Sequence, residues 1–311
     1  MLFDEPTLRK LNQLTLVASR IRAGGMQGDR RSTKRGSSVE FADYRNYTPG
    51  DDLRRIDWNI YARLDRPFVK LFEEEEDLSV TILLDGSRSM DWPPPPSVPP
   101  FSAKSSGKWG DERGAHKFNY ALRLAAGLGA VALDAGDQLS VVFLQDGRVA
   151  ADFGPSRGGA SLARLFGFLE GLHPGGQTDL HAALRQALVK PRRPGLVILI
   201  SDLLSAEGYE SGLREWLGRG HQAALIHVLA PDELDPPLAG DLQLVDVETG
   251  REQDVSLDGG LRSLYRERAR AWVQSIQTDC RKRAVRYLSL TTRQPWDQAL
   301  LLDMRRAGIV K

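Results

Sequence analysis

The segment 78–89 reads LSVTILLDGSRS, and it holds the pattern that decides the fold. Its first seven residues are mostly aliphatic, as in a strand that is buried on both faces of a parallel sheet. Directly after them, Asp85, Ser87 and Ser89 place one carboxylate and two hydroxyls at alternate positions of the outgoing loop. Ligands of open α/β sheets bind at the carboxyl ends of the strands. We therefore expect an oxygen-rich binding site on this loop.

Strand-like and helix-like segments alternate through the rest of the chain, which predicts an α/β fold with a doubly wound, mostly parallel sheet. The predicted strands are 78–84, 139–144, 149–153, 196–200, 223–229 and 285–290. The predicted helices are 118–135, 160–172, 180–190, 210–217, 261–283 and 294–306.

Two later loops supply further oxygens in the order that a known metal site requires. Thr178 lies in the turn-rich segment 175–179, and Asp202 follows the apolar run 196–201. The order Asp-x-Ser-x-Ser, then Thr, then Asp resembles the metal-ion-dependent adhesion site of von Willebrand factor A domains. The resemblance implies Mg²⁺ (or Mn²⁺) bound by five residues, and such a site captures an acidic residue of a partner protein. The set is Asp85, Ser87, Ser89, Thr178 and Asp202.

The residue types favour binding over catalysis. Oxygen ligands suit Mg²⁺ better than Zn²⁺. A phosphatase of the haloacid dehalogenase type needs Asp where this chain has Ser87, and the nucleophile-elbow pattern Gly-x-Ser-x-Gly is missing. The five histidines show no ligand spacing. We expect no enzyme. One alternative is a metal-dependent hydrolase with Asp91 or Asp179 as general base. The other is a metal-free scaffold, since Asp and Ser after a strand also form turns and N-caps.

Outside the predicted sheet, the pattern divides the chain in two. Residues 1–77 form a helix at about 6–22 and a small β module at 39–72, and residues 78–311 form the main domain. The main domain has a proline-rich insertion at 91–116 and a hairpin at 241–257. Isolated two-stranded sheets are marginally stable, so we expect the hairpin to pack on the module and complete a β subdomain.

Composition indicates a soluble protein without a global charge signal. The 311 residues include 42 Lys and Arg against 41 Asp and Glu, so the net charge of +1 gives no field to recruit nucleic acid. The single cysteine, Cys280, fits a reducing compartment. The first residues do not form a signal peptide, and the apolar runs are too short to span a bilayer. We expect a cytoplasmic protein with no membrane insertion.

A second long motif lies upstream of the metal motif. Residues 36–58 read GSSVEFADYRNYTPGDDLRRIDW, and 61–63 continue as YAR. Together with the metal motif, they resemble the signature of the bacterial family catalogued as domain of unknown function fifty-eight. The resemblance implies a von Willebrand factor A-like domain with a small β subdomain. It also implies a role as substrate adaptor or co-chaperone of a MoxR-type AAA+ ATPase, with that ATPase or a client protein as partner. The proline-rich insertion departs from the family pattern.

The aromatic and charged residues of this signature have a structural interpretation. We expect Tyr44, Tyr47 and Trp58 in the core or at an interface of the β module. The arginines and aspartates are expected to form an ion network, because guanidinium groups bind carboxylates bidentately. These residues are Arg45, Arg54, Arg63, Asp51, Asp52 and Asp57.

Overall fold

The computed structural model describes residues 5–11, 13–18, 39–48, 50–51, 53, 56–74, 78–93, 116–190, 192–237, 240–246, 251–257 and 259–311. The chain divides into two compact units. The larger unit comprises Met1–Ile21 and Leu78–Lys311, and the smaller unit comprises Arg22–Asp77. The N-terminal segment therefore groups with the main domain, and not with the β module as its sequence position led us to expect.

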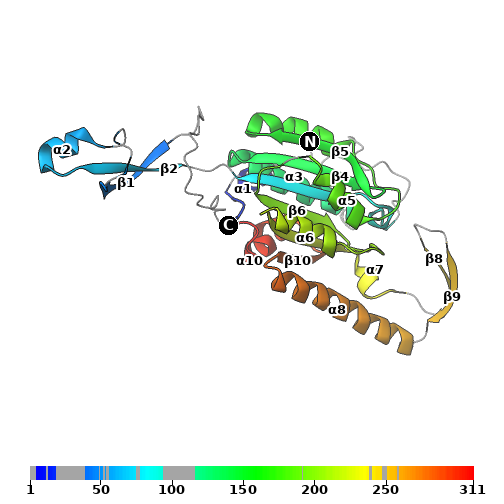
Figure 1. Ribbon diagram of the computed structural model, residues 1–311. Coiled ribbons are helices and arrows are strands. Elements are labelled where there is room, and N and C mark those ends of the chain that lie inside the picture. Colours follow the sequence, from blue (N-terminus) through cyan, green and yellow to red (C-terminus); the bar gives the residue numbers. More distant parts are fainter. Residues whose placement is uncertain are drawn as a thin grey trace. The chain divides into compact units, whose positions relative to one another are not determined.

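A six-stranded sheet forms the centre of the larger unit (Figure 1). Every neighbouring pair is parallel except the last, in which β5 runs antiparallel to β4. The strand order is β10 (Arg286–Thr291), β7 (Gln222–Leu229), β6 (Leu196–Ser201), β3 (Ser79–Asp85), β4 (Gln138–Gln145) and β5 (Arg148–Ser156). The predicted α/β class with a mostly parallel sheet is confirmed.

Helices cover both faces of this sheet and enclose two hydrophobic cores. On β3, Val80, Ile82 and Leu84 belong to one core and Leu83 belongs to the other, because successive side chains of a strand point to opposite faces. The first core contains α3 (Lys117–Asp134) and α4 (Leu162–Glu170), and the second contains α5 (Leu180–Ala187), α6 (Glu210–Gly218) and the C-terminal part of α8 (Gly259–Lys282).

The two ends of the chain lie together on the first core. Helix α1 (Glu5–Leu11) ends well before the predicted boundary, and the described residues 13–18 are not helical. Leu16 forms an isolated bridge with Val310, and Val17 N donates to the carbonyl of Ile309 at 2.9 Å. The longer helix was a wrong prediction, because Leu14 and Leu16 are buried at alternate positions against a partner at the other end of the chain.

The last segment also differs from one regular helix. It consists of α9 (Trp296–Gln298), a π-helical turn (Ala299–Asp303) and α10 (Met304–Arg306). Ala299, Leu300 and Met304 of this segment are buried in the first core. A short helix that was not predicted, α7 (Pro231–Leu234), follows β7 and contributes to the site described below.

The smaller unit is a hairpin with a helix in its connection. Strand β1 (Val39–Asn46) pairs antiparallel with β2 (Phe68–Glu74), and α2 (Trp58–Leu64) lies between them in sequence. The carboxylate of Asp57 caps α2 through the N–H groups of Asn59 and Ile60, and it accepts the hydroxyl of Tyr44 at 2.9 Å. Trp58 is 61% exposed, so it does not lie in a core of the module, and its alternative place at an interface stays a prediction.

Part of the predicted ion network is present, and part lies outside the described residues. Arg45 Nη2 donates to Asp51 Oδ1 at 2.8 Å. Asp57, in contrast, acts as the helix cap. Asp52 and Arg54 lie outside the described residues, as does most of the proline-rich insertion, at 94–115.

The predicted hairpin is present as β8 (Gly240–Val245) paired antiparallel with β9 (Glu252–Leu257). It belongs to the larger unit, whereas the β module forms the smaller one. Its packing on the module stays a prediction.

Candidate functional site

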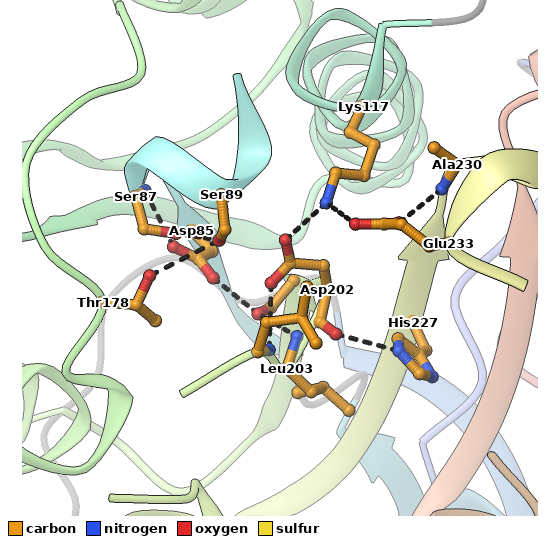
Figure 2. Close-up of polar contacts among 12 residues, drawn as sticks. Asp85, Ser87, Ser89, Lys117, Thr178, Asp202, Leu203, His227, Ala230 and Glu233 are labelled. Atoms are coloured by element: carbon orange, nitrogen blue, oxygen red, sulfur yellow. Dashed lines mark hydrogen bonds and ion pairs between the residues drawn. The ribbon is translucent and has the colours of Figure 1, made fainter. Parts of the chain in front are cut away.

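The three predicted loops meet at the carboxyl edge of the sheet (Figure 2). Asp85 ends β3 in the middle of the sheet, Asp202 follows the neighbouring strand β6, and Thr178 lies two residues before α5. Ser87 Oγ lies 3.0 Å from Ser89 Oγ, which lies 3.4 Å from Thr178 Oγ1. The hydroxyls therefore form one cluster beside Asp85.

Backbone hydrogen bonds hold the first two loops together. Gly175 N donates to the carbonyl of Gly86 at 2.8 Å, and Arg88 N donates to the carbonyl of Gly176 at 3.2 Å. A side chain at position 86 would displace the ring of Phe143, because a Cβ there would lie 2.0 Å from its Cε2. The hydroxyl cluster is thus fixed by the main chain and by close packing on β4.

Asp85 is a buried carboxylate that is bonded by neutral groups. Its side chain accepts Ser87 N at 2.9 Å and Ser201 Oγ at 2.6 Å, and the residue is 1% exposed. Burial and the nearby charge of Asp202 raise the pKa of Asp85 to about 6. Sequence reasoning missed Ser201, although a hydroxyl at the end of the apolar strand 196–200 was the available signal.

Asp202, by contrast, has a basic partner. Lys117 Nζ lies 2.7 Å from Asp202 Oδ2 and 2.5 Å from Glu233 Oε1. The other oxygen of Asp202 accepts Leu204 N at 3.1 Å, so both carboxylate oxygens are used. Burial lowers the pKa of Lys117, but the charges of Asp202 and Glu233 outweigh this effect and raise it, so the side chain is an ammonium.

Sequence reasoning also missed Lys117 and Glu233. Lys117 is the first residue of α3 and is fully buried, and Glu233 lies on α7. Glu233 Oε2 accepts Ala230 N at 2.7 Å, as in a capping box. The available signal was a lysine at the start of an apolar helix, but the neighbouring sequence does not indicate which carboxylates pair with it.

A buried histidine fixes the backbone behind Asp202. His227 Nε2 donates to the carbonyl of Asp202 at 2.9 Å, which leaves Nδ1 to accept the hydroxyl of Tyr287 at 2.8 Å. Burial lowers the pKa of His227 to about 4, so the ring is neutral. The ring thereby orients the loop after β6.

A cavity of about 10 Å³ lies against Asp85, Ser87 and Thr178, and this volume is close to that of a single water molecule or ion. The two candidate bases of the hydrolase alternative already have partners. Asp179 Oδ1 accepts Ala182 N at 2.9 Å as the N-cap of α5, and Asp91 Oδ1 pairs with His116 Nε2 at 3.0 Å.

Four of the five predicted ligands have the chemistry that a hard cation requires, and Asp202 differs. Across the part of the chain that the structure describes, no group of three or more His, Cys, Asp or Glu residues could bind a metal ion. A cation at this edge would depend on one buried carboxylate and neutral hydroxyls. Asp85, Ser87, Ser89 and Thr178 have this chemistry, which suits Mg²⁺. Asp202 differs, because it is already paired with the Lys117 ammonium.

Comparison with known proteins identifies the family. The sequence profile described as "Protein of unknown function DUF58" matches residues 43–94 and 101–274. The chain belongs to the DUF58 family. It is 28% identical to the uncharacterized protein Rv1480 of Mycobacterium tuberculosis over 98% of this chain and 92% of that protein. It is 32% identical to the uncharacterized protein MAV169 of Mycobacterium avium over 42% of this chain and 78% of that protein.

Solved structures similar to this DUF58 chain include BatB from Bacteroides thetaiotaomicron, described as a conserved hypothetical protein. It has 15% identity and a TM-score of 0.38, over 74% of this chain and 98% of that one. A von Willebrand factor type A protein from Catenulispora acidiphila has 14% identity and a TM-score of 0.36, over 78% and 44%. Among the helices that the structure describes, none has the length and apolar character needed to cross a bilayer.

Proposed function

We propose that this DUF58 protein is a binding module that captures a partner protein through Mg²⁺ or Mn²⁺ at the carboxyl edge of its sheet, and that it is not a catalyst. One observation carries the proposal. Asp85 is a buried carboxylate with hydrogen bonds from neutral groups, and it lies beside three hydroxyls and a small cavity that Asp85, Ser87 and Thr178 line. An uncompensated buried charge is costly, and a cation would remove that cost.

The residues of the site have distinct roles in this proposal. Asp85 supplies the negative charge that attracts the ion, while Ser87, Ser89 and Thr178 supply neutral oxygens. A bound ion would supply an electrophilic centre with room for one acidic side chain of the partner, since Mg²⁺ commonly shares its coordination with a ligand. The hydrogen bonds from Ser201 and Ser87 N hold the Asp85 carboxylate in one orientation.

The partner in this proposal is a MoxR-type AAA+ ATPase or one of its client proteins. The family resemblance of the signature at residues 36–58 implies this partner class, and membership of DUF58 supports the resemblance. The module would act as an adaptor or co-chaperone, by presenting the metal edge to an acidic residue of the partner.

The experiment compares the wild type with Asp85→Asn. We expect the wild type to bind Mn²⁺ in a calorimetric titration and to capture the candidate ATPase in Mg²⁺ but not in chelator. Asp85→Asn should lose both properties while it keeps its circular dichroism spectrum. Asp152→Asn, which changes an exposed carboxylate on β5, is the matched control and should behave as the wild type. A wild type without Mn²⁺ binding, or partner capture that persists in chelator, would refute the proposal.

A further inference from the structure

Lys117 brings a permanent positive charge into the site. The residue is fully buried at the start of α3, and its ammonium is held between two carboxylates from other parts of the chain, Asp202 after β6 and Glu233 on α7 (Figure 2). A buried charge is tolerated when it is paired and hydrogen-bonded. Here the contacts with both carboxylates keep the lysine side chain protonated.

Glu233 is fixed independently of the lysine. Its second oxygen accepts Ala230 N at 2.7 Å, and its backbone carbonyl accepts the hydroxyl of Tyr265 from α8 at 2.8 Å. The position of the ammonium therefore follows from three separate elements of the fold. It does not depend on the hydroxyl cluster.

The two aspartates of the predicted metal set are thus in different electrostatic states. Asp85 has hydrogen bonds from two neutral groups, Ser87 N and the hydroxyl of Ser201. Asp202 has an ammonium at 2.7 Å on one oxygen and a backbone N–H on the other. A cation that approached Asp202 directly would compete with the lysine and be repelled by it.

We propose that Lys117 acts as a built-in cation for Asp202. On this inference, which rests on the proposed function, the divalent ion is held by Asp85, Ser87, Ser89 and Thr178. Asp202 remains paired with the ammonium, which it shares with Glu233, and is not a ligand. Lys117 is then a positioning residue: it keeps the edge of the sheet folded without metal, and it keeps metal affinity below the value that a second free carboxylate would give.

The test uses Mn²⁺ as the probe and three variants of the full chain. Lys117→Met removes the ammonium and leaves Asp202 and Glu233 without their cation. Lys117→Met with Asp202→Asn replaces these two residues by neutral side chains and leaves Glu233 with its hydrogen bond from Ala230 N. Lys190→Met removes an exposed lysine that pairs with Asp152 at 2.6 Å, and it is the matched control. The readouts are the Mn²⁺ dissociation constant from calorimetry and the thermal midpoint in chelator and in Mn²⁺.

We expect Lys117→Met to bind Mn²⁺ about tenfold more tightly than the wild type, which is the scale of changes next to a metal site. Its thermal midpoint in chelator should fall, and Mn²⁺ should raise this midpoint more than it raises that of the wild type. The double variant should bind Mn²⁺ within about threefold of the wild type, since it loses no ligand. Lys190→Met should match the wild type in both readouts.

Two results would overturn the inference. One is unchanged or weaker Mn²⁺ binding by Lys117→Met. The other is a loss of about tenfold or more in the double variant, which would make Asp202 a ligand. If Lys117→Met does not fold, the double variant alone decides between the two readings. A wild type that binds no Mn²⁺ refutes the proposed function itself, whereas a wild type that binds while the double variant does not refutes only the role of Lys117.

Discussion

Asp85→Asn should make the metal-free protein more stable, although it removes the central residue of the site. In chelator, the ionised carboxylate is buried without a compensating cation, and its pKa is raised from 3.8 to about 6. Each pH unit between these values is worth about 1.4 kcal/mol, so ionised Asp85 destabilises the fold by about 3 kcal/mol at neutral pH. Asparagine removes this charge and keeps the size of the side chain.

The gain in stability is reduced by the change in the hydrogen bonds of residue 85. Asparagine can still accept Ser87 N, and its amide can donate to Ser201 Oγ in place of the bond that the carboxylate accepts. Replacing a charge-assisted bond by a neutral one costs about 1 kcal/mol. We therefore expect a net gain of about 2 kcal/mol for Asp85→Asn at pH 7.5. For a unit of this size, that gain raises the thermal midpoint by about 4–8 °C.

The pH dependence gives a second reading of the same effect. Because the folded-state pKa lies above the unfolded value, the native wild type holds an extra proton between about pH 4 and 6. The wild type therefore loses stability relative to Asp85→Asn as the pH rises through this window, and the variant has no advantage below it. Urea unfolding in chelator at pH 4 and pH 7.5 measures the difference, with Asp152→Asn as control. A variant that is less stable than the wild type at pH 7.5 would refute the reasoning.

Two further predictions concern parts of the larger unit away from the metal edge. Burial lowers the pKa of His221 to about 4, so between pH 6.5 and 4 the unfolded state binds a proton that the folded state does not bind. The free energy of unfolding of the wild type should therefore fall by about 3 kcal/mol over this range. His221→Phe keeps a ring against Trp216 and should show a flatter pH profile in urea titrations; parallel profiles would contradict this assignment. Leu16→Ala should lower the free energy of unfolding by about 2–3 kcal/mol, because Leu16 is buried in the core next to Val310. Val189→Ala is the control, because Val189 is 78% exposed, and it should change the free energy of unfolding little. A change for Leu16→Ala no larger than that for Val189→Ala would contradict the prediction.

The fold class was accessible from sequence because its signals are periodic and local. The apolar run before Asp85 and its repetition at 196–200 and 223–229 predict buried parallel strands, and β3, β6 and β7 are adjacent in the sheet. Carboxyl ends of parallel strands meet at one edge, which was enough to place Asp85, Ser87 and Ser89 there. Thr178 precedes α5 and was grouped with them only by the resemblance to the adhesion-type metal site. Their hydroxyls do form one cluster.

Predictions from the local sequence pattern were wrong where tertiary contacts favour a different local structure. The leucines between residues 8 and 16 have near-helical spacing, yet Leu16 pairs with Val310 in extended form because the two chain ends cover the same core. Trp58 is a large aromatic residue of the type expected in a core, but it is the first residue of a short helix that has no buried residue. For Leu16, burial against a distant element overrides local propensity, as in many short segments.

The sequence by itself determined which residues carry oxygen to the edge of the sheet, and the tertiary structure decided their charge states. Lys117 is 85 positions from Asp202 and 116 from Glu233, and Ser201 is 116 positions from Asp85. No local pattern links such residues. They meet because the sheet order places β3 beside β6 and the start of α3 over their carboxyl ends, and buried charges are stable only where the fold supplies a partner.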